Sequence, residues 1–197
     1  MTFEKKIILK FNDSQKKFPI EILNCWDLTE LEIIGGNFSY FPEDIGILKN
    51  LKRLTVCSSQ ISIIPKEIFE LPHLTYLNLK NNKIIELPIL TQKSQIQTLI
   101  LGRNCITLID QAFTHLLELL TLDLGFNLFT KIPDDLYLLK KLQRLNFDSN
   151  KLKIIPFILK DLKQLSHLSL ENNLFSKDQI KTIEQEFHIN LSHTSIN

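Results

Sequence analysis

Apolar residues recur along this chain at an interval of 23 residues, and this recurrence defines its architecture. In each copy the first, fourth and sixth positions are apolar, whereas the third and fifth are mostly polar, as in Leu119–Asn127 (LLTLDLGFN). Alternation with a period of two predicts a short β-strand that buries one side. One interval, between the third and fourth copies, is 22 residues. The seven copies begin at Leu28, Leu51, Leu74, Ile96, Leu119, Leu142 and Leu165.

A single strand of this kind cannot bury its leucines alone, so consecutive copies are expected to stack with their strands in parallel. The ninth position is Asn in each copy from Asn82 to Asn173, but it is Ser59 in the second copy and Gly36 in the first. A buried Asn amide both donates and accepts hydrogen bonds, so stacked Asn residues predict a ladder that satisfies the backbone where each strand turns. We therefore expect the first two copies to be less regular.

The second half of each copy provides the return path that parallel strands require. Proline followed by acidic residues is typical of the first turn of a short helix. The third copy instead has polar residues at Thr91–Gln95, which predicts a loop, and the fourth copy lacks the proline. The apolar–proline pairs are Phe41-Pro42, Ile64-Pro65, Leu87-Pro88, Ile132-Pro133 and Ile155-Pro156.

The combined frame, LxxLxLxxNxLxxLPxxIxxLxx, resembles the leucine-rich repeat family in its 23-residue class, over roughly Ile7 to Phe187. The LPxxI turns and the short capped end are most similar to bacterial members, including those of spirochaetes. The resemblance implies an α/β leucine-rich-repeat solenoid. In such a curved arc, a parallel sheet of about eight strands forms the concave face, and short helices, 3₁₀ turns and loops form the convex face.

The two ends of the chain are expected to cover the open core of the stack. Ile7–Phe11 with Phe18-Pro19 predicts a first strand in a degenerate repeat, and Trp26 is expected to pack between that strand and the first full repeat. The sequence thus predicts a single domain in three parts, namely an N-terminal cap over residues 1–27, seven repeats over residues 28–175, and a C-terminal cap helix and tail over residues 176–197.

The C-terminal cap is predicted from a helical pattern. Ser176 or Asp178 can cap a helix in which Ile180, Ile183 and Phe187 lie on one face, and this face is expected to cover the last repeat. The final residues, Leu191–Asn197, are expected to be loosely held.

Charge and composition narrow the possible functions. The net charge is +1, so there is no basic excess for binding nucleic acid. No apolar run is long enough to cross a bilayer, and the first residues do not form a secretory signal, which predicts a protein that is cytoplasmic or exported without a recognisable signal peptide. Cys25, Cys57 and Cys105 are odd in number and not spaced as metal ligands, which favours a reducing compartment.

The repeat frame leaves positions three, five, seven and eight free, and the resemblance places them on the concave face. These columns are basic in the middle, through Lys80 and Arg103, and acidic toward the C-terminus, with aromatic residues between. Arginine and aromatic residues beside an apolar patch are typical of protein-binding hot spots. The candidate partner-binding residues are Arg53, Tyr76, Asn78, Lys80, Ile100, Arg103, Asp123, Phe126, Arg144, Asn146, Asp148, His167 and Glu171. Alternatively, the charges neutralise one another and Phe126 packs against its neighbours.

These observations predict a non-enzymatic protein–protein recognition module without a cofactor or bound metal, whose partner is a protein. The bacterial resemblance makes a host-interacting or virulence-associated protein a candidate, and an intracellular scaffold or regulatory subunit is the alternative. We expect a monomer, with a dimer as the alternative. The sequence contains no HExxH, CxxC or glycine-rich phosphate loop.

There are three alternatives to protein binding through the concave face, two of which involve residues of that face and one of which involves the convex side. Asp148 and Glu171 are expected to be adjacent carboxylates, near Asn172 and His167, and such a cluster could hold a cation or serve an enzyme. Cys57 lies on the same face, but an activated thiol needs a nearby base, and the repeat frame brings none. Phe157-Ile158-Leu159 places apolar residues after a proline, which could form a convex contact or a dimer surface.

Overall fold

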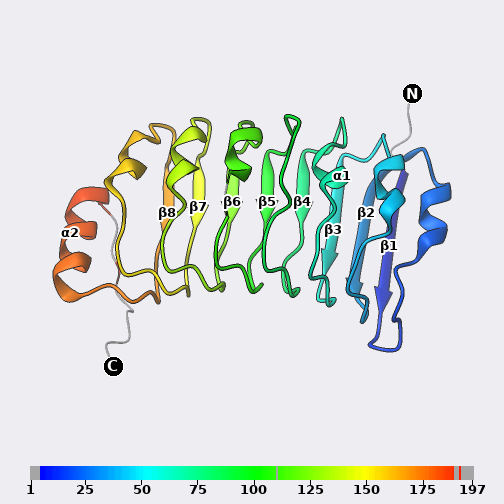
Figure 1. Ribbon diagram of the computed structural model, residues 1–197, viewed down its shortest axis with the longest axis horizontal. Coiled ribbons are helices and arrows are strands. Elements are labelled where there is room, and N and C mark those ends of the chain that lie inside the picture. The colour runs from blue at the N-terminus through cyan, green and yellow to red at the C-terminus, as the bar shows by residue number, and fades with distance from the viewer. Residues whose placement is uncertain (1–4, 110, 189–190, 192–197) are drawn as a thin grey trace.

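The computed structural model describes residues 5–109, 111–188 and 191 and shows an elongated solenoid with one continuous parallel sheet (Figure 1). The strands pair in sequence order, each with the next one along the chain. Leu31 is paired with Leu54, and Leu54 with Leu77, so the full repeats keep the same register, whereas β1 has a register shift against β2 between Lys5 and Lys6. The strands are β1 (Lys5–Phe11), β2 (Leu28–Gly35), β3 (Arg53–Cys57), β4 (Tyr76–Asn78), β5 (Thr98–Ile100), β6 (Thr121–Asp123), β7 (Arg144–Asn146) and β8 (His167–Ser169).

The frame residues fill the space between the sheet and the return segments. Within the second to sixth repeats the first, fourth and sixth positions are almost fully buried, including Leu122 and Leu124. Adjacent repeats also stack aromatic rings, since the rings of Phe129 and Phe147 meet edge to face with centroids 5.3 Å apart. The hydrophobic burial that holds the arc together is thus shared between neighbouring repeats, as the sequence pattern predicts.

Short helical segments cover the convex side in most repeats. Five of them follow a proline that immediately precedes the first helical residue, as Pro133 does. The third repeat has no helix over Thr91–Gln95, which confirms the predicted loop, and the fourth repeat starts its helix after Gln111, whose φ is 54°. The segments are η1 (Ile20–Asn24), η2 (Glu43–Ile47), α1 (Lys66–Phe69), η3 (Ala112–His115), η4 (Asp134–Leu138) and η5 (Phe157–Asp161), followed by α2 (Lys177–Phe187).

The predicted Asn ladder is present from the third repeat to the seventh. The Nδ2 group of Asn127 donates to the carbonyl oxygens of Leu101 (3.1 Å) and Leu124 (3.0 Å), and its Oδ1 accepts from the backbone N–H of Ile106 (3.0 Å). In the second repeat Ser59 makes a single substitute bond, from Oγ to the oxygen of Gly35 at 2.7 Å. The first two full repeats have no Asn at the ninth position, but their strands, β2 and β3, are longer than those that follow.

The backbone turns left-handed at the eighth position of every repeat. Asn81, Arg103 and Phe126 have φ values of 59°, 58° and 57°, and the first repeat uses Gly35 with φ 82°. Left-handed backbone is favourable for Gly and tolerable for Asn, but costs about 1 kcal/mol or more for other residues. The fold therefore imposes this conformation at a position that the sequence fills with very different side chains.

The N-terminal cap is formed by phenylalanines, and the expected role of Trp26 is wrong. Phe18 is buried and contacts the ring of Phe38 edge to face at 5.6 Å, as well as the ring of Phe41 at 5.7 Å. Trp26 is 71% exposed, because it lies in the turn between η1 and β2 rather than on an inward position of the frame. Phe18 thus does the packing that we expected of Trp26.

The C-terminal cap agrees with the sequence pattern. Ser176 Oγ accepts from the backbone N–H of Gln179, and the Gln179 side chain accepts from the N–H of Ser176, which forms a reciprocal capping box for α2. Ile183 of this helix is fully buried against the last repeat. Leu191 is also buried, contrary to the expected loose tail, and its N–H donates to Glu184 Oε1 at 3.0 Å. Residues 192–197 lie outside the described residues.

Candidate functional site

The outward-facing columns of the sheet bring together candidate residues from different repeats. Arg53 is directly paired with Tyr76 across β3 and β4, and Arg144 with His167 across β7 and β8. At the fifth position, Ile100 is paired with Asp123, and Asp123 in turn with Asn146. Neighbouring parallel strands lie about 4.8 Å apart, so each column is a line of adjacent side chains.

A shallow depression of about 260 Å³ lies over β5 to β8 on this face. Six of the candidate residues line it, and the frame residues Leu122 and Leu145 form part of its wall. Thr121 and Ser169 also line it and were absent from the predicted site, although they occupy the third and fifth positions. The six candidates are Ile100, Asp123, Arg144, Asn146, Asp148 and His167.

Charged side chains on the N-terminal part of the concave face form a network of ion pairs. The Arg53 guanidinium lies 3.7 Å from the ring centre of Tyr76, and its Nε is 3.5 Å from Glu30 Oε1. Lys6 Nζ is 3.0 Å from the same Glu30 oxygen and 3.7 Å from Glu32. The positive charge of Arg53 is therefore partly neutralised within the chain, and exposed pairs of this kind add little stability.

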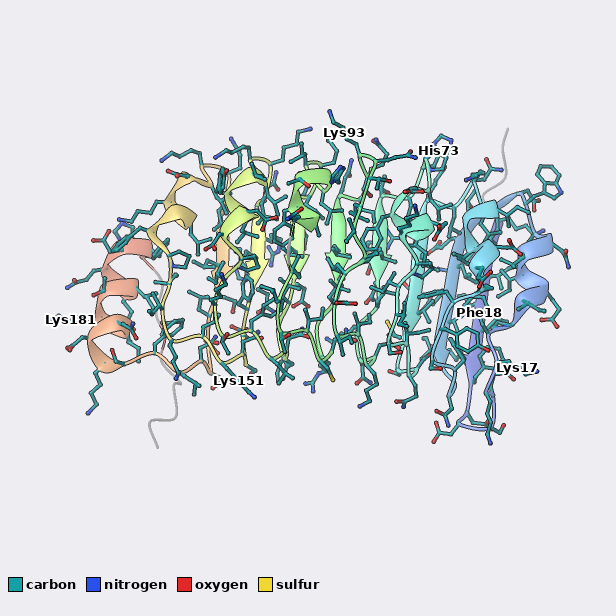
Figure 2. All side chains as sticks on the ribbon, in the orientation of Figure 1. Lys17, Phe18, His73, Lys93, Lys151 and Lys181 are labelled. Carbon is teal, nitrogen blue, oxygen red and sulfur yellow. The ribbon has the colours of Figure 1, made fainter. Side chains whose placement is uncertain are left out.

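Arg103 and Phe126 form a second stack, away from the depression. The Arg103 guanidinium lies 4.1 Å from the ring centre of Phe126, and 47% of Phe126 is exposed. Both residues follow the carboxyl ends of their strands. They therefore lie on the side of the molecule where the strands terminate, which is the side on which Figure 2 labels Lys151. The region where the basic and acidic parts of the concave face were predicted to meet thus consists of two parts, a polar depression and a separate cation–aromatic pair.

Three candidate residues of the fifth column also stabilise the strand ends. The side-chain oxygens of Asn78, Asp123 and Asn146 each accept from the backbone N–H two residues later, at 3.1, 3.0 and 2.7 Å. Gly125 leaves room for one of them, because a Cβ atom there would lie 2.9 Å from Asn146 Nδ2. These side chains therefore have a structural role in this strand-end turn, in addition to any role in binding.

The structure gives the acidic pair little capacity for a cation. Both carboxylate oxygens of Asp148 accept from Ser169 Oγ, at 2.6 and 2.7 Å, and Oδ1 also accepts from the backbone N–H of Glu171 at 2.7 Å. Among the residues that the structure describes, no three His, Cys, Asp or Glu side chains group closely enough to hold a metal ion. Asp148 thus serves as an acceptor that joins β7 to β8.

Cys57 does not have the environment of a reactive thiol. Burial raises the pKa of Cys57 to about 11, and its Sγ contacts the carbonyl oxygen of Asn78 at 3.9 Å. The thiolate is the nucleophilic form, so a raised pKa leaves little of it at neutral pH.

The convex apolar segment is smaller than its sequence indicated. Phe157 is exposed beneath Lys160, whose Nζ lies 5.3 Å from the ring centre, whereas Leu159 is buried in the core. The side chain of Ile158 lies outside the described part of the chain. Within the described ranges, no helix is both long and apolar enough to cross a membrane.

Comparison with known proteins agrees with this architecture. Residues 49–89 match the family model described as "Leucine rich repeat". Two rice proteins (Oryza sativa subsp. japonica), both named disease resistance protein RGA4, are 38% identical over 113 residues and 36% identical over 83 residues. These matches cover 50% and 36% of this chain but only 11% and 8% of the rice proteins.

Solved structures share the fold over most of the chain. An internalin from Listeria monocytogenes superimposes with a TM-score of 0.70 at 24% identity, covering 87% of this chain and 49% of the internalin. A leucine-rich repeat protein of Leptospira interrogans gives a TM-score of 0.60 at 24% identity, covering 88% and 56%. The sheet, the Asn ladder and these matches define a leucine-rich repeat solenoid. The 23-residue class and the spirochaete affinity stay predictions.

Proposed function

We propose that this chain is a non-enzymatic recognition module whose concave face binds a segment of a partner protein. The observation that carries the proposal is the stack of Arg103 on Phe126 in left-handed backbone. Asn81 and Asn172 occupy the equivalent position with less strain. An exposed aromatic residue kept in a costly conformation contributes nothing to the core, and such strain is characteristic of functional positions.

The chemistry of the pair favours a carboxylate in the partner. A guanidinium stacked on a ring keeps its N–H edge free for bidentate binding of a carboxylate. Within the described residues, Arg103 forms no salt bridge, and its guanidinium lies over the Phe126 ring. Because the guanidinium is already held in place, binding would lose little side-chain entropy. The neighbouring Lys80 adds to the positive charge in this part of the face.

The depression over β5 to β8 supplies the second contact. Arg144 and His167 are exposed next to each other on its third column, and Asp123 lies in its fifth column. A partner segment that extends from Arg103 toward β8 would therefore meet mixed charges. A host-directed or virulence-associated role stays a prediction from the sequence, because the similar bacterial structures at 24% identity share the fold alone.

Affinity capture with matched variants tests this proposal. The chain and its Arg103→Glu and Phe126→Ala variants are used as bait in lysates, and bound proteins are quantified by mass spectrometry. The control for Phe126→Ala is Phe157→Ala, which removes an exposed ring beneath a lysine on the convex side. We expect a partner that both concave variants lose by at least about tenfold and the control retains. Equal capture by all three variants and the parent chain would refute the location of the site.

A further inference from the structure

A row of exposed apolar side chains follows one flank of the arc, outside the concave face. Tyr40 and Ile63 are joined by a parallel β-bridge between the first two full repeats. Ile85, Ile89 and Leu108 of the next two repeats line a depression of about 410 Å³. The flank row consists of Ile20, Tyr40, Ile63, Ile85, Ile89 and Leu108, all of which are exposed.

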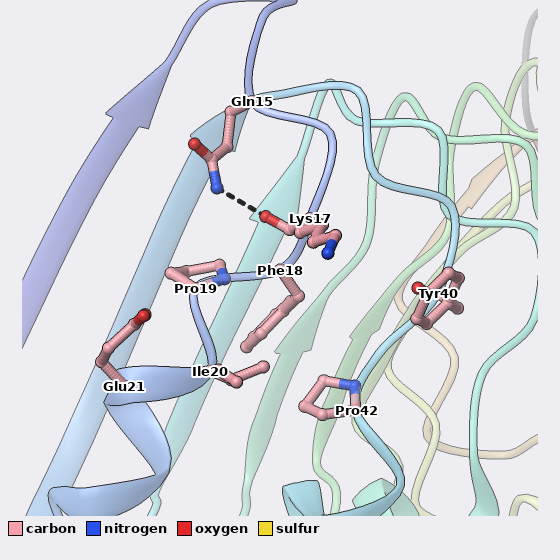
Figure 3. Close-up of a pocket in the computed structure, with 8 residues that line it drawn as sticks. All are labelled: Gln15, Lys17, Phe18, Pro19, Ile20, Glu21, Tyr40 and Pro42. Atoms are coloured by element: carbon pink, nitrogen blue, oxygen red, sulfur yellow. Dashed lines mark hydrogen bonds between the residues drawn. The ribbon is translucent and has the colours of Figure 1, made fainter.

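The loops that carry the row stay in register from repeat to repeat. The backbone N–H of Lys83 donates to the oxygen of Ile61, and that of Cys105 to the oxygen of Ile84, both at 2.8 Å. At the N-terminal end the row is continuous with the cap, since Ile20 and Tyr40 line the same cavity of about 340 Å³ (Figure 3). The row therefore follows the repeats, but Glu86 occupies in the third repeat the position that Tyr40, Ile63 and Leu108 hold in theirs, so one carboxylate lies within it.

The shortened third repeat leaves its own part of this row uncovered. The connection between β4 and β5 has no helix, whereas α1 and η3 occupy the repeats on either side (Figure 1). Ile89, at the place where a helix would begin, is 83% exposed. Ile85 and Ile89 are thus exposed in the repeat that has no helix.

We propose that the flank row is the interface of a symmetric dimer of this chain. The six residues together expose on the order of 700 Å² of surface. Two copies that bury the row against each other would cover about 1,400 Å², within the usual range for a specific interface of about 1,200–2,000 Å². A net charge of only +1 per chain adds little repulsion between the copies.

A two-fold axis suits a straight row because it superimposes the row on itself in reverse. Ile63 lies in the middle, with two repeat units on each side, so the axis would pass beside it. Ile63 would then contact Ile63 of the second copy, and Tyr40 would contact the third repeat, including Ile85 and Ile89. Both concave faces stay open in this arrangement.

The chain itself offers a matched control. Lys131 interrupts the apolar column after Leu108 and pairs with Asp134 at 3.2 Å. Beyond it, Ile154 occupies the same repeat position as Ile63 with nearly the same exposure, 66% against 68%. Substitution at either residue changes the surface and leaves the core untouched.

Sedimentation velocity over a range of concentrations tests the dimer. We expect the parent chain and Ile154→Glu to shift from monomer to dimer as concentration rises, and Ile63→Glu to remain monomeric at a concentration at least about tenfold higher. A parent chain that is monomeric throughout overturns the proposal, as does dissociation by Ile154→Glu without dissociation by Ile63→Glu. Circular dichroism checks that both variants are folded.

Oxidative cross-linking tests the axis. In a two-fold dimer, Ile63→Cys brings two identical thiols within disulfide distance, so a covalent dimer should form on non-reducing gels. Ile154→Cys and the parent chain, with its three native cysteines, should not form it. A non-covalent dimer in which Ile63→Cys fails to cross-link overturns the placement of the axis at Ile63.

Discussion

The Arg103 guanidinium lies over the ring of Phe126, 4.1 Å from its centre, and both residues have left-handed backbone. We predict that Phe126→Asn stabilises the chain by about 0.5–1 kcal/mol, because Asn tolerates this backbone better than Phe. The same change should abolish capture of the partner. Thermal unfolding and affinity capture measured on one preparation would test both effects, and a destabilised variant would mean that the ring contributes to packing.

The Asn ladder should be among the most sensitive positions in the chain. Asn127→Ala removes an amide whose two groups satisfy buried backbone on two repeats, so we expect a loss of about 2–4 kcal/mol in the free energy of unfolding. Asn78→Ala, which removes a more exposed turn bond, should cost under about 1 kcal/mol. Urea denaturation of the two variants provides the comparison, and equal losses would contradict the assigned role of the ladder.

Cys57 should be slow to react with alkylating reagents. With its pKa raised by burial to about 11 from an ordinary value of 9.0, its thiolate population near pH 8 is about 100-fold smaller than that of an unperturbed thiol. Mass spectrometry of timed iodoacetamide reactions, with glutathione as reference, measures this rate. Fast alkylation at pH 8 would show that the thiol is more accessible than the structure indicates.

The same shift predicts a pH effect on stability. The unfolded chain ionises Cys57 above pH 9, while the folded chain keeps it protonated up to about pH 11, so this residue's contribution is present below pH 9 and is lost as the pH rises to 11. The difference in unfolding free energy between the parent chain and Cys57→Ala should therefore change over this window and be constant below it.

Gly125 should couple to Asn146 in a double-mutant cycle. An added Cβ at Gly125 would lie within 2.9 Å of Asn146 Nδ2 and would displace the side chain that accepts from the N–H of Asp148. We expect Gly125→Ala to destabilise the chain by about 1–2 kcal/mol, and to cost much less when Asn146→Ala is already present. Additive losses in denaturant titrations would show that the two side chains do not compete for space.

The sequence predicts the solenoid well because the same short-range packing and hydrogen bonds recur in successive repeats. Leu122, Asn127 and Ile132 each occur at a position that recurs, so one interpretation of the frame places all copies, and strand register follows from the spacing. The misplaced Trp26 shows how size alone misleads: its size indicated burial, but eight residues after Phe18 it occupies the position that the exposed Lys49 holds after Phe41. Phe18, at the position of the apolar–proline pairs, carried the better signal.

The candidate site was predictable only as a set of columns. Register fixes that Arg144 lies beside His167, but the hydrogen bond from Ser169 to Asp148 depends on side-chain rotamers, which the repeat frame does not specify. The flank row lies outside the concave columns on which the predicted binding site rests. Its signal was present in the sequence, since Tyr40, Ile63 and Leu108 occupy one repeat position, which carries Glu86 in the third repeat and Lys131 in the fifth.

The Asn amides also give the arc a direction. Each one satisfies the turn of the repeat before it, as Asn150 does by accepting from the N–H of Phe129 at 3.0 Å, so every repeat depends on its successor until Ser176 and α2 close the series. Adding or deleting a whole repeat upstream of that end creates no new kind of contact. The length of the binding surface can therefore change in steps of about 4.8 Å by duplication or loss of a repeat, while the C-terminal cap formed by Ser176 and α2 stays the same.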